Sequence, residues 1–221
     1  MKGRIGNIDG WIPPISQDEI FFSKGEKSFS RCQMSGFVLS FSRKIAYICT
    51  SFNLNQKRKE MKTERAIFAA GCFWGVQHQF DRMRGVTKTT VGYTGGEEEN
   101  PTYHEVKAHR THHVEAVLVE YDAETVTYTD LCKLFFEIHD PAQIDGIGPD
   151  IGPQYRSEIF YLDDIQRKEA EAVIALLREK GYEVNTALRP AERFWEGEDY
   201  HQHYYDKTGG EPYCHIRVKK F

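Results

Sequence analysis

Strand-like and helix-like segments alternate along residues 62–221, and this order limits the possible folds more than any other feature of the sequence. Apolar or β-branched runs typical of strands occupy 65–70, 86–93, 114–121, 157–162 and 183–188. Helical spacing of apolar residues occupies the stretch after residue 72, then 127–139 and 163–180, with a short helix expected around 198–206. The pattern predicts an α/β sandwich of short mixed or antiparallel strands with packed helices, ending in a mostly irregular segment of about thirty residues.

Residues 1–60 differ from the rest of the chain. They are basic overall, whereas residues 61–221 are acidic and contain all nine histidines. They show no sustained helical or strand periodicity, and Met61 resembles a second start site. We therefore expect 1–60 to be an extension that is disordered or not part of the native fold, and 61–221 to form a single catalytic domain.

Composition argues against several classes of protein. The longest apolar run has six residues (172–177), whereas a membrane span needs about 20, so no membrane segment is expected. A net charge of −4 gives no reason to expect nucleic acid as a partner. The five cysteines form no C-x-x-C pair, which predicts neither a disulfide scaffold nor a structural zinc site. Together with the missing export signal, this usage predicts a reducing, cytoplasmic location. The scattered apolar pattern predicts a monomer.

The strand-to-helix junction Gly71-Cys72-Phe73-Trp74-Gly75 is the predicted chemical centre. Free backbone N–H groups and the helix dipole at such a junction favour the thiolate form of cysteine, which is the nucleophile. The two glycines allow a tight turn, and the two aromatic residues predict an apolar pocket for a group such as a methyl. Alternatively, Cys72 is a buried core thiol between two core aromatics.

Motifs in the same order as in a known family extend this pattern over about residues 62–218. The matching segments are Gly71–Gly75, Gly92–Gly96, Asn100–Tyr103, His113–Val117, His139–Pro141, Gly148–Asp150, Gln154–Ser157, Glu198–Gln202 and Tyr213–Cys214. In these motifs the chain resembles the A-type peptide methionine sulfoxide reductases. The resemblance implies a ferredoxin-like two-layer sandwich with a mixed sheet, and reduction of methionine S-sulfoxide, free or in oxidised proteins, without a cofactor or metal.

The resemblance also implies roles for individual residues. Cys72 would attack the sulfoxide sulfur, and Glu115 would give a proton to the sulfoxide oxygen. The remaining assignments are Phe73 and Trp74 around the methyl group, Tyr103 and Tyr155 as hydrogen-bond donors to the oxygen, and Asp150 in the polar rim.

General chemistry supports the role of Glu115. A sulfoxide oxygen is a poor leaving group, so the attack requires its protonation. Desolvation beside an apolar strand raises the pKa of a carboxyl group, which makes Glu115 a suitable acid near neutral pH. Alternatively, Glu115 is a solvated strand residue flanked by Val114 and Ala116.

Turnover requires a second reaction, because the oxygen remains on Cys72 as a sulfenic acid. Cys214 aligns with the first resolving cysteine of many family members, which implies a Cys72–Cys214 disulfide that thioredoxin reduces. The chain ends at Phe221 without the later cysteine of some members, so direct reduction of the sulfenic acid by an external thiol remains open.

Other readings of the same residues stay open. Cys72 could serve a cysteine hydrolase with a histidine base, or a thiol-based redox sensor without turnover. His109, His112, His113, His201 and His203 lack metal-ligand spacing and are interpreted as polar loop and surface residues. Cys132 is expected to be a packed, inert thiol, and Cys32 and Cys49 receive no role.

Overall fold

A computed structural model of the chain describes residues 62–147 and 150–221. The strands are β1 (Thr63–Ala70), β2 (Val86–Thr94), β3 (Val114–Asp122), β4 (Gly146–Ile147), β5 (Asp150–Ile151), β6 (Ser157–Tyr161), β7 (Ala187–Pro190) and β8 (Trp195–Glu196). The helices are α2 (Phe73–Asp81), α3 (Tyr103–Lys107), α4 (Tyr128–Glu137), the 3-10 helix η2 (Pro153–Tyr155), α5 (Asp164–Glu179) and α6 (Tyr204–Thr208). The predicted extension 1–60 lies outside the described residues.

One six-stranded sheet organises the described residues, in the order β7-β6-β1-β3-β2-β8. All neighbouring pairs are antiparallel except β6 and β7, which are parallel. The elements β1-α2-β2-β3-α4-β6 form a βαββαβ unit with the central order β6-β1-β3-β2, which is the ferredoxin-like arrangement. The predicted fold, helices packed on a mixed sheet, is confirmed.

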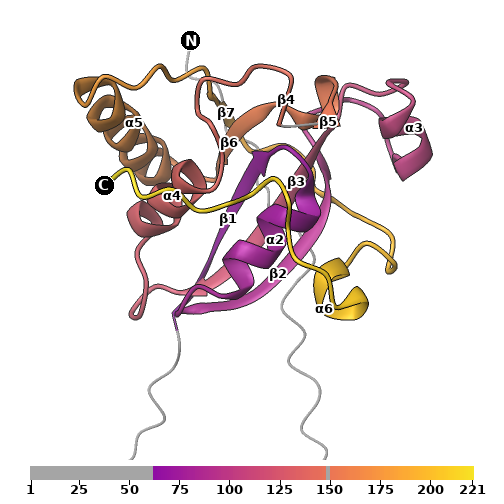
Figure 1. The fold of residues 1–221 in the computed structure, drawn as a ribbon, viewed down its shortest axis with the longest axis horizontal. Helices are drawn as coiled ribbons and strands as arrows, with labels where there is room; N and C mark the ends of the chain where they lie inside the picture. The colour runs from indigo at the N-terminus through magenta and orange to yellow at the C-terminus, as the bar shows by residue number, and fades with distance from the viewer. Residues whose placement is uncertain (1–61, 148–149) are drawn as a thin grey trace, which may run out of the picture. The chain divides into compact units, whose positions relative to one another are not determined.

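The sheet separates two apolar clusters because successive strand residues face opposite sides. On β1, Phe68 faces the larger cluster, which α2, α4 and α5 cover, and Ile67 faces the smaller one. The smaller cluster is closed by Phe194. Figure 1 shows α2 lying across the face of the sheet formed by β1, β2 and β3. On β3, Val117 and Val119 belong to the helix-covered cluster, so Glu115, two residues before Val117, points to that same side.

Helix boundaries follow the capping residues. Thr127 caps α4 in a capping box with Asp130, and Asp163 accepts hydrogen bonds from the first turn of α5, so both helices begin where the predicted ranges 127–139 and 163–180 begin. Thr102 and Glu105 form a second capping box that begins α3, a short helix that was not predicted.

Two predicted elements differ from the structure. The strand expected over 183–188 begins at Ala187, because Asn185 bonds through its backbone and side chain to Pro141 and Ala142 in the loop after α4. The helix expected around 198–206 is confined to Tyr204–Thr208. The two-residue strands β4 and β5, which pair with each other, were not predicted.

The irregular C-terminal segment is held by backbone hydrogen bonds, by Lys220 and by the ion pair of Arg217 with Glu137. Figure 1 shows it leaving α6, passing α2 and ending beside α4 and α5. Val218 donates its backbone N–H to Glu137, and Lys220 donates to the carbonyls of Phe136 and His139. Among the described residues, no helix combines the length and apolar character that crossing a bilayer requires.

Candidate active site

Cys72 stands at the turn between β1 and α2. Gly71 has a φ of +91°, a left-handed conformation that favours glycine, and Cys72 is the residue before the first helical residue, Phe73. The turn therefore directs the Cys72 side chain to the N-terminal end of α2. The thiol is 7% exposed and lines a cavity of about 280 Å³. This placement agrees with the predicted strand-to-helix junction.

Glu115 reaches the same helix start from β3. Its side chain is buried, and its Oε2 accepts the backbone N–H of Phe73 at 3.1 Å. Burial raises the pKa of Glu115 to about 8, while the Phe73 hydrogen bond opposes the shift. The alternative reading as a solvated strand residue is therefore wrong, because the strand turns this carboxyl group toward α2. Near neutral pH the group is largely protonated and can donate a proton.

The Cys72 thiol differs from its predicted state. The hydrogen bond with the backbone of Trp74 favours the thiolate, but burial and the nearby Glu115 carboxyl group together raise the pKa of Cys72 well above its usual value. The backbone hydrogen bond at the start of α2 is too weak to offset the effects of burial and of Glu115 on this pKa. In the free protein the thiol is thus protonated near neutral pH, and the expected acidic thiol is corrected to a protonated one.

The cavity brings together the residues that the family resemblance assigned to substrate binding. Cys72 and Glu115 share it with Phe73, Trp74, Tyr103, Tyr155 and Asp150. Burial raises the pKa of Tyr103 to about 12 and also raises that of Tyr155. Both phenols therefore remain protonated and can donate hydrogen bonds to an oxygen atom in the cavity.

Two lining residues had no role in the sequence analysis. Tyr213 enters from the C-terminal segment and donates its hydroxyl to Asp150 Oδ2 at 2.9 Å. Lys107, at the end of α3, brings a positive charge to the rim. Tyr213 could have been suspected from the sequence, because it directly precedes Cys214. Lys107 lay within a segment that carried no predicted element.

Aromatic rings form one wall of the cavity. Trp74 stacks on Tyr204 with ring centroids 3.8 Å apart, and its indole N–H donates to His201 Nδ1 at 3.1 Å. His201 is buried and also lies against Phe73 and Tyr103. The orientation of Trp74 is thus set by residues from the last quarter of the chain.

Cys214 lies beside the Cys72 turn. The residue before it, Tyr213, lines the cavity, and the residue after it, His215, donates through Nε2 to the carbonyl of Ala70 at 2.8 Å. His215 also packs on Gly75, where an added Cβ would lie 2.2 Å from the imidazole. The two flanking residues therefore hold Cys214, a free and half-buried thiol, next to the junction that carries Cys72.

The histidines were predicted to be loop and surface residues, and this is only partly correct. His109 and His112 are exposed, but His113 and His201 are buried. The His113 ring packs inside the 95–98 turn, accepting from the Gly96 N–H and bonding to the Glu98 carbonyl. A histidine inside such a turn is buried by backbone that a local pattern does not reveal.

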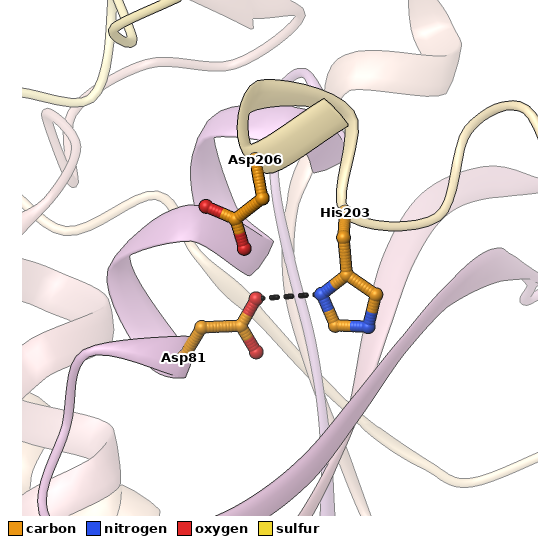
Figure 2. Close-up of side chains that lie close together, drawn as sticks. All are labelled: Asp81, His203 and Asp206. Carbon is orange, nitrogen blue, oxygen red and sulfur yellow. Dashed lines mark hydrogen bonds and ion pairs between the residues drawn. The ribbon is translucent and has the colours of Figure 1, made fainter. Parts of the chain in front are cut away.

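Figure 2 shows the described side chains whose ligand atoms lie close enough together to hold a cation: Asp81 at the end of α2, with His203 and Asp206 beside it. Both oxygens of Asp81 already accept hydrogen bonds, from Thr89 Oγ1 at 2.6 Å and His203 Nδ1 at 2.9 Å. We assign these contacts to anchoring α6, which carries Tyr204, against α2.

Cys132 is fully buried on α4, and burial raises its pKa, as expected for a packed thiol. Cys32 and Cys49 lie outside the described residues. Residues 148 and 149 of one quoted motif lie outside them as well.

Comparisons with known proteins cover most of the chain. Residues 64–221 match the family model described as peptide methionine sulfoxide reductase. A peptide methionine sulfoxide reductase MsrA of Acinetobacter baumannii (strain AYE) is 43% identical over 155 residues, which is 70% of this chain and 90% of the relative. The corresponding protein of Sulfolobus acidocaldarius is 45% identical over 163 residues, 72% of this chain and 93% of the relative.

Solved structures give the same result. Mxr1 from Saccharomyces cerevisiae in reduced form has a TM-score of 0.67 and 31% identity, covering 74% of this chain and 98% of that protein. Methionine sulfoxide reductase A of Corynebacterium diphtheriae has a TM-score of 0.62 and 35% identity, covering 69% of this chain and 78% of that protein.

Proposed function

The chain belongs to the peptide methionine sulfoxide reductase family, and from this premise we propose that Cys72 is the nucleophile that removes oxygen from the substrate. The chain is a peptide-methionine (S)-S-oxide reductase, an oxidoreductase that depends on thiols. This activity replaces the hydrolase and redox-sensor readings. The observation that carries the proposal is that a largely protonated, buried Glu115 shares one cavity with the Cys72 thiol.

In the first step the Cys72 sulfur attacks the sulfoxide sulfur while Glu115 donates a proton to the sulfoxide oxygen. The carboxylate that forms accepts the proton that leaves the Cys72 thiol. The protonated oxygen then moves from the methionine sulfur to the Cys72 sulfur as the transient S–S bond between them breaks. Methionine departs and Cys72 is left as a sulfenic acid, so Cys72 is oxidised as the substrate is reduced. The raised pKa of Cys72 fits this order, because the thiol loses its proton only when the carboxyl group has given up its own.

The other lining residues position the substrate. Phe73 and Trp74 offer apolar surface to the methyl group, and the phenols of Tyr103 and Tyr155 donate hydrogen bonds to the charge that develops on the oxygen. Asp150, held by Tyr213, belongs to the polar rim that orients the rest of the substrate.

In the second step Cys214 attacks the sulfenic acid to form a disulfide with Cys72. The support is the placement of Cys214 between Tyr213 in the cavity and His215 over Gly75. A dithiol protein such as thioredoxin then reduces the disulfide by thiol–disulfide exchange. Oxidised proteins and free methionine sulfoxide are the proposed substrates.

A reductant-coupled assay on the separate S and R epimers tests the first step. We expect turnover of the S epimer only and its loss in Cys72→Ser, with Cys132→Ser as the matched control that keeps activity. Turnover by Cys72→Ser would overturn the assignment. Thiol counting after one turnover tests the second step: two thiols lost per chain in the unmodified protein and one in Cys214→Ser support it.

The same assay on residues 61–221 tests the proposal that the first sixty residues are dispensable. We expect the shortened chain to keep the activity of the full chain, since the family match begins at residue 64. Loss of activity on removal would contradict it. The monomeric state and the cytoplasmic location stay predictions.

A further inference from the structure

The environment of His215 defines where its proton sits. Its ring is buried, and Nε2 lies 2.8 Å from the carbonyl oxygen of Ala70. A carbonyl can only accept a hydrogen bond, so Nε2 of the neutral ring carries the hydrogen and Nδ1 presents a lone pair. Nδ1 lies 3.1 Å from Cys214 Sγ, so the thiol donates its proton to the imidazole in this hydrogen bond.

The protonation states of His215 and Cys214 suit a proton transfer from the thiol to the imidazole. Burial lowers the pKa of His215 and raises that of Cys214 to about 11. At pH 7 only about one Cys214 in ten thousand would be a thiolate without help. The neutral imidazole beside the thiol is therefore an acceptor that is already deprotonated. The Ala70 hydrogen bond and the charge of Asp150 oppose this lowering of the His215 pKa. A charge on His215 would in turn lower the pKa of the buried His139.

The backbone keeps this base beside the reaction centre. The Ala70 carbonyl belongs to the end of β1 and Gly75 to the first turn of α2, so His215 contacts both sides of the Cys72 turn. Any side chain on Gly75 would displace the ring, since a Cβ would lie 2.2 Å from Nδ1. Gln79 further fixes the segment by donating to the backbone carbonyl of His215 at 2.8 Å.

We propose that His215 is the general base that accepts the Cys214 proton as the Cys214 sulfur attacks the Cys72 sulfenic acid. This inference rests on the proposed function, in which Cys214 resolves the intermediate. The new S–S bond forms as the S–O bond of the sulfenic acid breaks. Cys214 is oxidised and the sulfenic sulfur is reduced, and the hydroxyl group leaves as water with the proton that His215 received.

A single-turnover experiment tests the base on the full chain. The protein is mixed with stoichiometric methionine S-sulfoxide, and free methionine and disulfide are measured over time at each pH from 6.5 to 9. In the unmodified protein we expect the rate constant of the step from sulfenic acid to disulfide, separated from the first step by the methionine time course, to change little over this range, because the imidazole is already neutral. A rate that rises tenfold per pH unit would mean that attack waits for free Cys214 thiolate, and would overturn the proposal.

His215→Gln provides the second test, with rates normalised to the methionine burst. We expect disulfide formation to slow about 100-fold at pH 7 and to acquire the tenfold rise per pH unit, approaching the unmodified rate at high pH. A merely structural role would lower the rate equally at every pH. His139→Gln is the matched control, because it removes a buried imidazole that bonds to Phe135 and Ser157 instead of a thiol.

The outcomes separate the two proposals. If His215→Gln forms the disulfide as fast as the unmodified protein at pH 7, the base is excluded while Cys214 remains the resolving cysteine. If the unmodified protein forms no disulfide and loses only one thiol, the resolving role of Cys214 is wrong, and the inference about His215 falls with it.

Discussion

Two buried glutamates on the central sheet have opposite electrostatic surroundings. Glu115 on β3 is 2% exposed and Glu158 on β6 is 3% exposed. Glu158 is paired with Arg156 at 2.9 Å and with Arg189 at 3.3 Å, whereas the hydrogen bond that reaches the Glu115 carboxyl group comes from the neutral backbone of Phe73. Similar burial therefore leads to different chemistry: Glu158 forms ion pairs that join β6 to β7, and Glu115, which has no ion pair among the described residues, holds a proton that the proposed mechanism uses.

The largest expected effect comes from removing the acidic proton of Glu115, the proposed general acid. Glu115→Gln should lower the rate of methionine formation in a single turnover by about 100-fold to 10,000-fold at pH 7, the usual range for loss of general acid catalysis. The amide is neutral and similar in size, so the free energy of unfolding in urea should not fall. Full activity in this variant would remove Glu115 from the mechanism.

The next largest effect is on stability and comes from Glu158, the glutamate that forms ion pairs. Glu158→Gln leaves two arginines without their carboxylate, and the free energy of unfolding should fall by about 2 kcal/mol. Urea denaturation measures the loss, with Glu115→Gln as the matched control at equal burial. The methionine burst should persist, since Glu158 has no part in the proposed reaction. An unchanged unfolding midpoint would show that the ion pairs contribute nothing to stability.

The pH dependence of the first step sharpens the difference. The raised pKa of Glu115, about 8, means that the acid is present below pH 8 and is lost as the pH rises through it. The rate of methionine formation should therefore fall about tenfold per pH unit above pH 8. This inflection should vanish in Glu115→Gln. A rate that rises through pH 8 in the unmodified protein would contradict the assignment.

The smallest expected effect tests how the arginines share Glu158. Arg156→Lys keeps the charge but cannot donate both to Glu158 and, as Nη2 now does, to the His112 carbonyl at 3.1 Å. We expect the free energy of unfolding to fall by about 0.5 kcal/mol, because this side chain is partly exposed to solvent. A loss as large as that of Glu158→Gln would mean that Arg156 alone supports the buried carboxylate.

Much of the fold was predictable because it depends on local sequence. The helix caps at Thr127 and Asp163 and the apolar periodicity of α4 and α5 act within a few residues, so these elements were located closely. The strand expected from residue 183 was misplaced because its start depends on bonds from Asn185 to a loop forty residues earlier. The candidate site residues came from the family motifs. Apolar periodicity alone favoured a solvated position for Glu115, because burial of this side chain depends on how β3 packs against α2.

By itself, the sequence determined the order of strands and helices, the strand-to-helix turn that carries Cys72, and membership of a family with known chemistry. Only the tertiary structure decided the protonation of the two reacting groups, because desolvation and proximity to other charges are properties of the packed site. It also decided that a histidine beside Cys214 presents a lone pair to its thiol, since the carbonyl that orients this ring belongs to Ala70, 145 residues away along the chain.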